Sequence, residues 1–262
     1  MKYPAAVILV LFFSTGITAV GQSPPQKQIA LRDGFIIDGI DGKISSTSTS
    51  SVESQGENWY FAVFEPLTDG QGVLASETAV QILPSSMLEK LAAAVSTESK
   101  NFRIWGKFTK YRGRNFIYLS YFLPVTEVDQ PAVEPDSADA NEEKIIPDDV
   151  LALLRPKRMV NLAELKKPLS TESDGIIADR TGFLRQEGND FYFDFDALGR
   201  NIDSLQLPLL NCEALEVMAK QQSLSTIPMR FKISAIVTGY KGKNYMLLQR
   251  ATRAYNHGNF AR

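Results

Sequence analysis

The sequence predicts a mainly β protein in which a unit of five strands and one helix occurs twice. The first observation is that segments 102–119 and 231–248 share seven of eighteen positions. The second is that three further pairs of segments match upstream, in the same order: 33–44 with 174–184, 56–65 with 188–196, and 80–95 with 205–220. Because four ordered matches are rarely accidental, they favour an internal duplication.

The first strand of each unit is expected around a pair of isoleucines, at 36–37 and at 176–177. Each of these strands continues past a glycine, Gly42 or Gly182. The second strand alternates with a period of two, which is typical of a half-buried strand. Its core face is expected to carry Trp59, Phe61 and Val63 in the first unit and Phe191, Phe193 and Phe195 in the second.

A short third strand should end at Pro84 or Pro208, and a helix should follow it. Ser86 lies three residues before Glu89, the spacing of a capping box, and Asn211 is the expected N-cap of the second helix. The last two strands form a long hairpin, turned by RGRN in the first unit and by KGKN in the second.

This order of elements resembles the OB-fold, a five-stranded Greek-key barrel. The predicted fold class is therefore mainly β, with two tandem OB-fold-like barrels at 31–125 and 174–255 and one helix in each. In leader and strand order the chain also resembles small exported bacterial OB-fold proteins. The resemblance implies a ligand surface on strands two and three, between the first and the last hairpin loops.

Composition predicts the nature of the remaining segments. Lys2 precedes a short apolar run at 5–13, and small residues occupy Ala19 and Gly21. That pattern predicts a secretory signal at 1–21, cleaved near Gly21, with export to the periplasm or beyond the cell. An uncleaved anchor is the alternative. The other expected segments are an N-terminal segment at 22–30, a linker at 126–150, a connecting helix and basic segment at 151–173, and a tail at 256–262.

Segment 126–150 is strongly acidic. It holds nine Asp and Glu residues, one lysine and three prolines. Such a composition is typical of a solvated linker. An acidic segment that recruits a basic partner is the alternative.

Catalytic and metal-binding motifs are not found in the sequence. Cys212 and His257 are the single cysteine and histidine, and Cys212 is expected to be a small buried residue. Asp194 and Asp196 form a carboxylate pair on one strand face, which is more often solubilising than catalytic. The prediction is a protein that is not an enzyme, without cofactor or metal.

Seven side chains are the binding candidates, because exposed aromatics can stack on a ligand and basic hairpin tips can hold an anion. They are Arg112, Arg114, Lys241, Lys243, Tyr60, Phe64 and Tyr192. The alternatives are that the aromatics cover the barrel or pack against the other unit, and that the hairpin turn needs only its glycine.

The predicted function is exported, non-enzymatic recognition of an anionic or saccharide polymer or of a cell-envelope protein. Oligomerisation through the barrel faces is the alternative, and an unrecognised hydrolase is a third. Export and the formal charge of −2 for the whole chain argue against nucleic acid as a partner.

Overall fold

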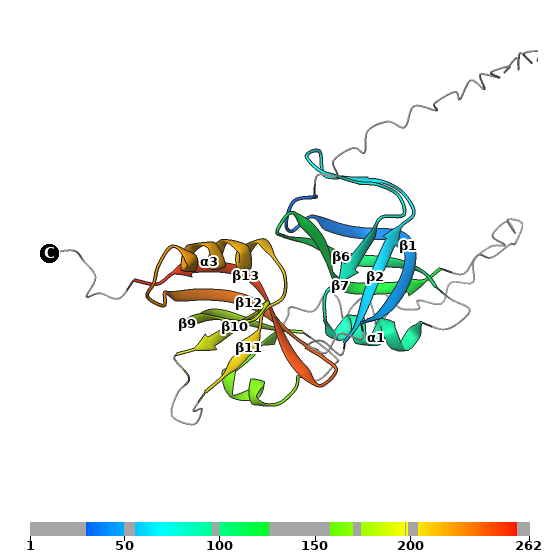
Figure 1. Ribbon diagram of the computed structural model, residues 1–262. Helices are drawn as coiled ribbons and strands as arrows, with labels where there is room; N and C mark the ends of the chain where they lie inside the picture. Colours follow the sequence, from blue (N-terminus) through cyan, green and yellow to red (C-terminus); the bar gives the residue numbers. More distant parts are fainter. Residues whose placement is uncertain are drawn as a thin grey trace, which may run out of the picture.

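A computed structural model describes residues 30–49, 56–95, 100–125, 158–169, 174–196, 198 and 204–255. The described elements form two lobes, which lie side by side in Figure 1. The expected signal, the acidic segment 126–150 and the tail 256–262 lie outside the described residues, so these expectations stay predictions. No helix of the described part is long and apolar enough to span a membrane.

The first lobe is a closed barrel with the strand order β1-β2-β5-β7-β6. Its strands are β1 (Ile36–Thr49), β2 (Gly56–Val63), β5 (Ala79–Ile82), β6 (Asn101–Tyr111) and β7 (Arg114–Pro124), with α1 (Ser86–Ala94) between β5 and β6. β5 and β7 pair in parallel, and the other neighbours pair antiparallel. The prediction of an OB-like barrel is confirmed for this lobe. A small hairpin of β3 (Leu67–Thr68) and β4 (Val73–Leu74) was not predicted.

The alternation of β2 places its core residues as expected. Trp59, Phe61 and Val63 are all buried. Gly42 of β1 pairs with Val63 of β2, and a Cβ at this glycine would overlap the carbonyl oxygen of Ala62 and the ring of Phe61. The close approach of the two strands therefore requires glycine at position 42.

The second lobe is built on a sheet with the order β11-β10-β9-β12-β13. The strands are β9 (Gly175–Glu187), β10 (Asp190–Phe195), β11 (Gln206–Pro208), β12 (Arg230–Tyr240) and β13 (Lys243–Arg253), with α3 (Glu213–Ser223) after β11. Before them come β8 (Arg158–Met159), which pairs with β9, and a 3-10 helix, η1 (Leu162–Lys166). Phe191, Phe193 and Phe195 are buried, as the alternation predicts.

Both predicted helix caps are wrong. Ser85, not Ser86, is the N-cap of α1, and its side chain accepts the N–H of Leu88. Cys212, not Asn211, precedes α3, and it makes no side-chain cap. The carboxylate of Asp33 in the first lobe instead accepts the N–H of Glu213, at 3.3 Å. The second helix is therefore capped across the two lobes, which local sequence cannot indicate.

Candidate functional site

The two hairpin tips have the same backbone conformation. Arg112 and Gly113 have φ of 49° and 72°, and Lys241 and Gly242 have φ of 47° and 73°. Two consecutive positive φ values are typical of a type I′ turn, in which glycine is favoured. The turn therefore explains the two glycines, as expected.

Each tip is bound by the helix of the opposite lobe. The N–H of Arg112 donates to Oε2 of Glu216 on α3 at 2.6 Å, and the N–H of Lys241 donates to Oε2 of Glu89 on α1 at 2.9 Å. This exchange places the tips between the lobes. Figure 1 shows the β12–β13 hairpin extending toward α1.

The side chains of the tip residues remain exposed. The Arg112 guanidinium lies 5.1 Å from the centre of the Tyr111 ring, and the Lys241 ammonium lies 5.4 Å from that of Tyr240. Lys241 also lies 3.8 Å from a carboxylate oxygen of Glu57. Each cation thus lies against the tyrosine of its own hairpin, and Lys241 also contacts the other lobe.

The remaining tip residues, Arg114 and Lys243, are exposed at the start of β7 and β13. The asparagine that follows each of them has a structural role. Asn115 exchanges two hydrogen bonds with the backbone of Leu31. Asn244 accepts the N–H of Leu169 and donates to the carbonyls of Leu165 and Lys167.

A buried polar network joins the lobes beside the tips. Asp174 accepts hydrogen bonds from Ser86 Oγ at 2.7 Å, from Thr238 Oγ1 at 2.6 Å and from the hydroxyl of Tyr118. Thr238 Oγ1 in turn accepts the N–H of Ser86 at 2.8 Å. Complete burial raises the pKa of Tyr118 well above its usual value, so its hydroxyl stays protonated and donates to Asp174.

The three aromatic candidates do not gather in one place. Phe64 is 45% exposed directly after β2, and Tyr60 lies partly buried on β2. Tyr192 lies on β10 of the other lobe, where burial raises its pKa and nearby Asp190 and Glu187 raise it further. Among the described residues no ring contact or hydrogen bond joins them.

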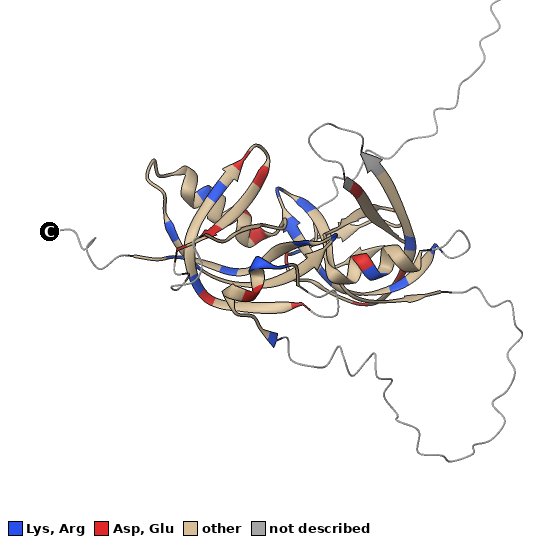
Figure 2. Cartoon of the chain, turned by 90° about the horizontal axis from the view of Figure 1, so that it is seen from below, with Lys and Arg blue, Asp and Glu red and all other residues tan. Residues whose placement is uncertain are grey.

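Charge is distributed unevenly between the hairpins and the rest of each lobe. The described residues contain 21 Lys and Arg against 17 Asp and Glu, a difference of +4, although the whole chain carries −2. Segments 100–125 and 230–255, which contain the β6–β7 and β12–β13 hairpins, hold six basic residues each and no acidic one. Figure 2 shows the basic and acidic positions of both lobes.

Sequence reasoning missed one aromatic pair on the first of these hairpins. Trp105 and Tyr121 lie opposite each other on β6 and β7, and both are partly exposed. Alternation along the strand could have indicated this pair. Trp105 follows the core residue Ile104, so it shares the outward face of the strand with Arg103 and Lys107.

Asp194 lies on β10, Asp196 directly follows this strand, and the two carboxylates have different surroundings. Burial raises the pKa of Asp194. Asp196 is also partly buried, but hydrogen bonds from Arg230 and Thr181 lower its pKa overall. Within the described part of the chain, no group of three or more His, Cys, Asp or Glu side chains is placed to hold a metal ion.

Cys212 is buried, as predicted, and burial raises the pKa of its thiol to about 12. A thiol with that pKa is almost fully protonated at pH 8, and only the thiolate attacks a disulfide. The native protein is therefore expected to react with a disulfide reagent at pH 8 orders of magnitude more slowly than the chain in guanidinium chloride. Rapid reaction of one thiol in the native state would contradict this placement.

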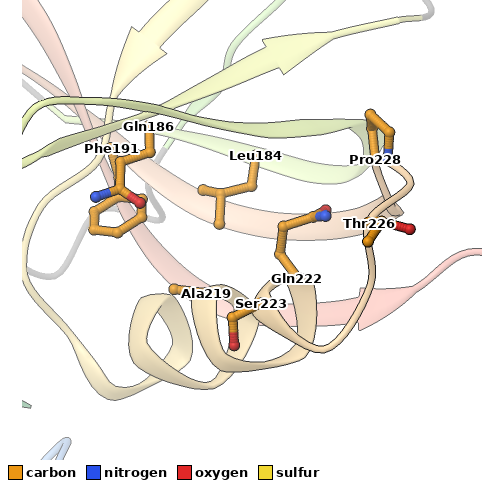
Figure 3. A pocket seen from close by; sticks show the side chains of 8 residues that line it. All are labelled: Leu184, Gln186, Phe191, Ala219, Gln222, Ser223, Thr226 and Pro228. Atoms are coloured by element: carbon orange, nitrogen blue, oxygen red, sulfur yellow. The ribbon is translucent and has the colours of Figure 1, made fainter.

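A pocket of about 250 Å³ lies between α3 and β9–β10 of the second lobe (Figure 3). It is lined by Leu184, Gln186, Phe191, Ala219, Gln222, Ser223, Thr226 and Pro228. The amide of Gln222 already bonds the backbone of Ser225, Ile227 and Met229. No charged side chain is among these lining residues.

No protein-family model matches this chain, and no curated protein matches it in sequence. Solved structures similar to it include the tetrameric p202 HIN2 (9% identity, TM-score 0.23, covering 86% of this chain and 99% of that one). The p204 HINb domain is similar at 9% identity and TM-score 0.22, over 84% and 98% of the two chains. p202 HIN1 in complex with 12-mer dsDNA is similar at 10% identity and TM-score 0.18, over 89% and 94%.

Two sequence-based predictions are contradicted: that the ligand is an anionic or saccharide polymer or an envelope protein, and that nucleic acid is not a partner. Two of the similar structures are complexes with dsDNA. The prediction about nucleic acid was wrong because it used the charge of the whole chain, which is −2, whereas the described residues carry a net positive charge. With TM-scores near 0.2, the structures give no argument for what this chain itself binds.

Proposed function

We propose that this protein is a non-enzymatic nucleic-acid-binding protein whose two closing hairpins contact the phosphate backbone. The observation that carries the proposal is the charge of these hairpins, six basic residues and no acidic one in each of segments 100–125 and 230–255. Lys and Arg that neutralise phosphates release counterions, and this term supplies most sequence-independent affinity for nucleic acid.

Part of this basic charge already has an acidic neighbour. Arg103 pairs with Asp41, Arg230 with Asp196, and both Lys232 and Arg250 with Asp179. Five hairpin cations with exposed side chains have no ion pair among the described contacts: Lys100, Arg112, Arg114, Lys243 and Arg253. Arg112 lies in the turn whose backbone N–H is bound by Glu216 of the other lobe, so the other four are the best candidates for phosphate contacts.

The proposal includes a second barrel that repeats the first. Leu209, directly after β11, forms a parallel bridge with Met246 of β13, as Ile82 pairs in parallel with Ile117. Leu209 lies three residues before Cys212, which precedes α3, and Ile82 lies three residues before Ser85, which precedes α1. The shared strand order and the two asparagine contacts also support an internal duplication. Two such barrels joined through their hairpins would present both basic segments on one rigid body.

The experiment is fluorescence anisotropy of a labelled 20-base-pair duplex of random sequence with two variants of equal charge. The test variant is Lys100→Ala/Arg114→Ala/Lys243→Ala/Arg253→Ala. The control variant removes four exposed lysines elsewhere: Lys43→Ala/Lys90→Ala/Lys167→Ala/Lys220→Ala. We expect the test variant to bind at least about tenfold more weakly than the control at 100 mM salt, because it loses four phosphate contacts. Each lost contact should also lower the salt slope by about one.

Two outcomes would overturn the proposal. One is wild-type protein that does not bind duplex or single-stranded DNA or RNA at low salt. The other is equal weakening in both variants, which would mean that only overall charge matters and not the hairpins.

A further inference from the structure

The aromatic pair on the β6–β7 hairpin has a defined geometry. The ring centres of Trp105 and Tyr121 lie 5.5 Å apart, and the ring planes are inclined by 51°. Ile104 and Phe102 on the same strand are buried in the barrel, so Trp105 points outward from it. The pair is thus an aromatic surface on the outside of a hairpin without acidic residues.

The indole ring is held in place from two further directions. Its Nε1–H donates to Oδ1 of Asp38 at 3.1 Å. Gly39 lies beneath it with φ of +69°, at an irregularity in the β1–β6 register, and a Cβ there would lie 3.3 Å from Cζ2 of the indole. A glycine at this point allows the ring to lie close to the backbone of β1.

Basic side chains flank the pair along β6. Arg103 makes two hydrogen bonds to the carboxylate of Asp41, at 2.7 and 2.8 Å, which fixes its guanidinium. Lys107 donates to Oε1 of Gln249 in the second lobe at 3.0 Å. Since residues 103, 105 and 107 alternate with core residues, the indole lies between two cations on one face of the strand.

The second lobe lacks this arrangement. The positions that correspond to Trp105 and Tyr121 are Ser234 and Arg250. Asp179, which has φ of 53°, lies near this point and pairs with Arg250. The aromatic surface is therefore specific to the first lobe and is not needed by the fold that both lobes use.

We propose that Trp105 and Tyr121 form a stacking platform for an unpaired base of a single-stranded nucleic acid, with Arg103 and Lys107 beside the adjoining phosphates. This rests on the proposed function and adds a ligand class to it. Every base has a π-face, so a platform of this kind is tolerant of sequence. A base in a duplex is already stacked and cannot occupy it.

The test compares a thymidine 12-mer with an abasic 12-mer of equal charge. We expect wild-type protein to bind the thymidine strand about tenfold more tightly, the effect of one stacked base. Binding should also quench the emission of Trp105, while Trp59, the other tryptophan, is buried in the core and should not respond. Trp105→Ala should remove both the preference and the quenching.

Two further variants separate stacking from folding. Trp105→Phe keeps a ring but loses the bond to Asp38, so it should retain most of the preference for bases. Val73→Ala removes an exposed apolar side chain elsewhere on the lobe and should leave the preference unchanged. Thermal unfolding of each variant identifies any loss of structure.

The outcomes distinguish this proposal from the proposed function. Equal affinity of wild-type protein for the thymidine and abasic strands would overturn the platform, while leaving phosphate binding intact. A folded Trp105→Phe variant that loses the preference would also contradict stacking. If neither strand nor duplex binds, the proposed function itself fails.

Discussion

Replacing Asn244 by alanine should lower the free energy of unfolding by about 3 kcal/mol, since three hydrogen bonds are lost at a site that is only 8% exposed. The substitution leaves the N–H of Leu169 and the carbonyls of Leu165 and Lys167 without their partner. These groups belong to the segment that approaches β9, so this segment should separate from the hairpin first. Urea unfolding at 25 °C measures the effect.

The matched comparison is Asn115→Ala in the first lobe. Asn115 is less buried and makes two hydrogen bonds, both to Leu31. We expect a loss about two thirds as large. A change below about 0.5 kcal/mol for Asn244→Ala, the range of ordinary surface substitutions, would show that this asparagine does not hold the segment.

Replacing Asp174 by alanine should lower the free energy of unfolding by about 3 kcal/mol and weaken the contact between the lobes. The change removes the acceptor of three hydroxyl groups, of which those of Ser86 and Tyr118 come from the first lobe. A buried hydroxyl without a partner costs about 1–3 kcal/mol. Because the loss falls at the interface, the two lobes should then unfold in separate transitions.

The control for this variant is Asp190→Ala, which removes an exposed aspartate of the same lobe. It should change stability by no more than about 0.5 kcal/mol. Urea unfolding followed by tryptophan fluorescence reports the first lobe alone, since both tryptophans lie there, and far-UV circular dichroism reports both. The fluorescence and circular dichroism transitions of Asp174→Ala could instead coincide, at the same urea concentration as for the wild-type protein. That result would contradict a role of the network in holding the two lobes together.

The sequence predicted those parts of the fold that depend on local pattern. Phe191, Phe193 and Phe195 follow the period of two, and the structure buries all three. Element order predicted the barrel of the first lobe, and the RGRN and KGKN segments do form the closing turns. Each of these features is decided by residues close together in the chain.

The rest depends on contacts between residues far apart in the chain. Glu89 has the spacing of a capping-box residue, yet its carboxylate accepts the backbone N–H of Lys241 in the other lobe. Asp33 caps a helix that begins 180 positions later. No periodicity or propensity in one segment contains that information.

The prediction about partners failed for a different reason. The formal charge of the whole chain is −2, whereas binding depends on where the charges lie. Segment 126–150 contributes nine acidic residues to that total, and the two hairpin segments contribute none. A count for each segment would have revealed the basic hairpins.

The salt dependence of duplex binding tests the central claim most directly. If the hairpins contact phosphates through at least the four exposed cations, the logarithm of the association constant should fall with the logarithm of salt concentration with a slope of about −3.6 or steeper. Anisotropy titrations between 50 and 200 mM salt, about the range over which such slopes are clear, would measure it. A slope near zero, or a slope unchanged by loss of Lys100, Arg114, Lys243 and Arg253, would contradict the claim.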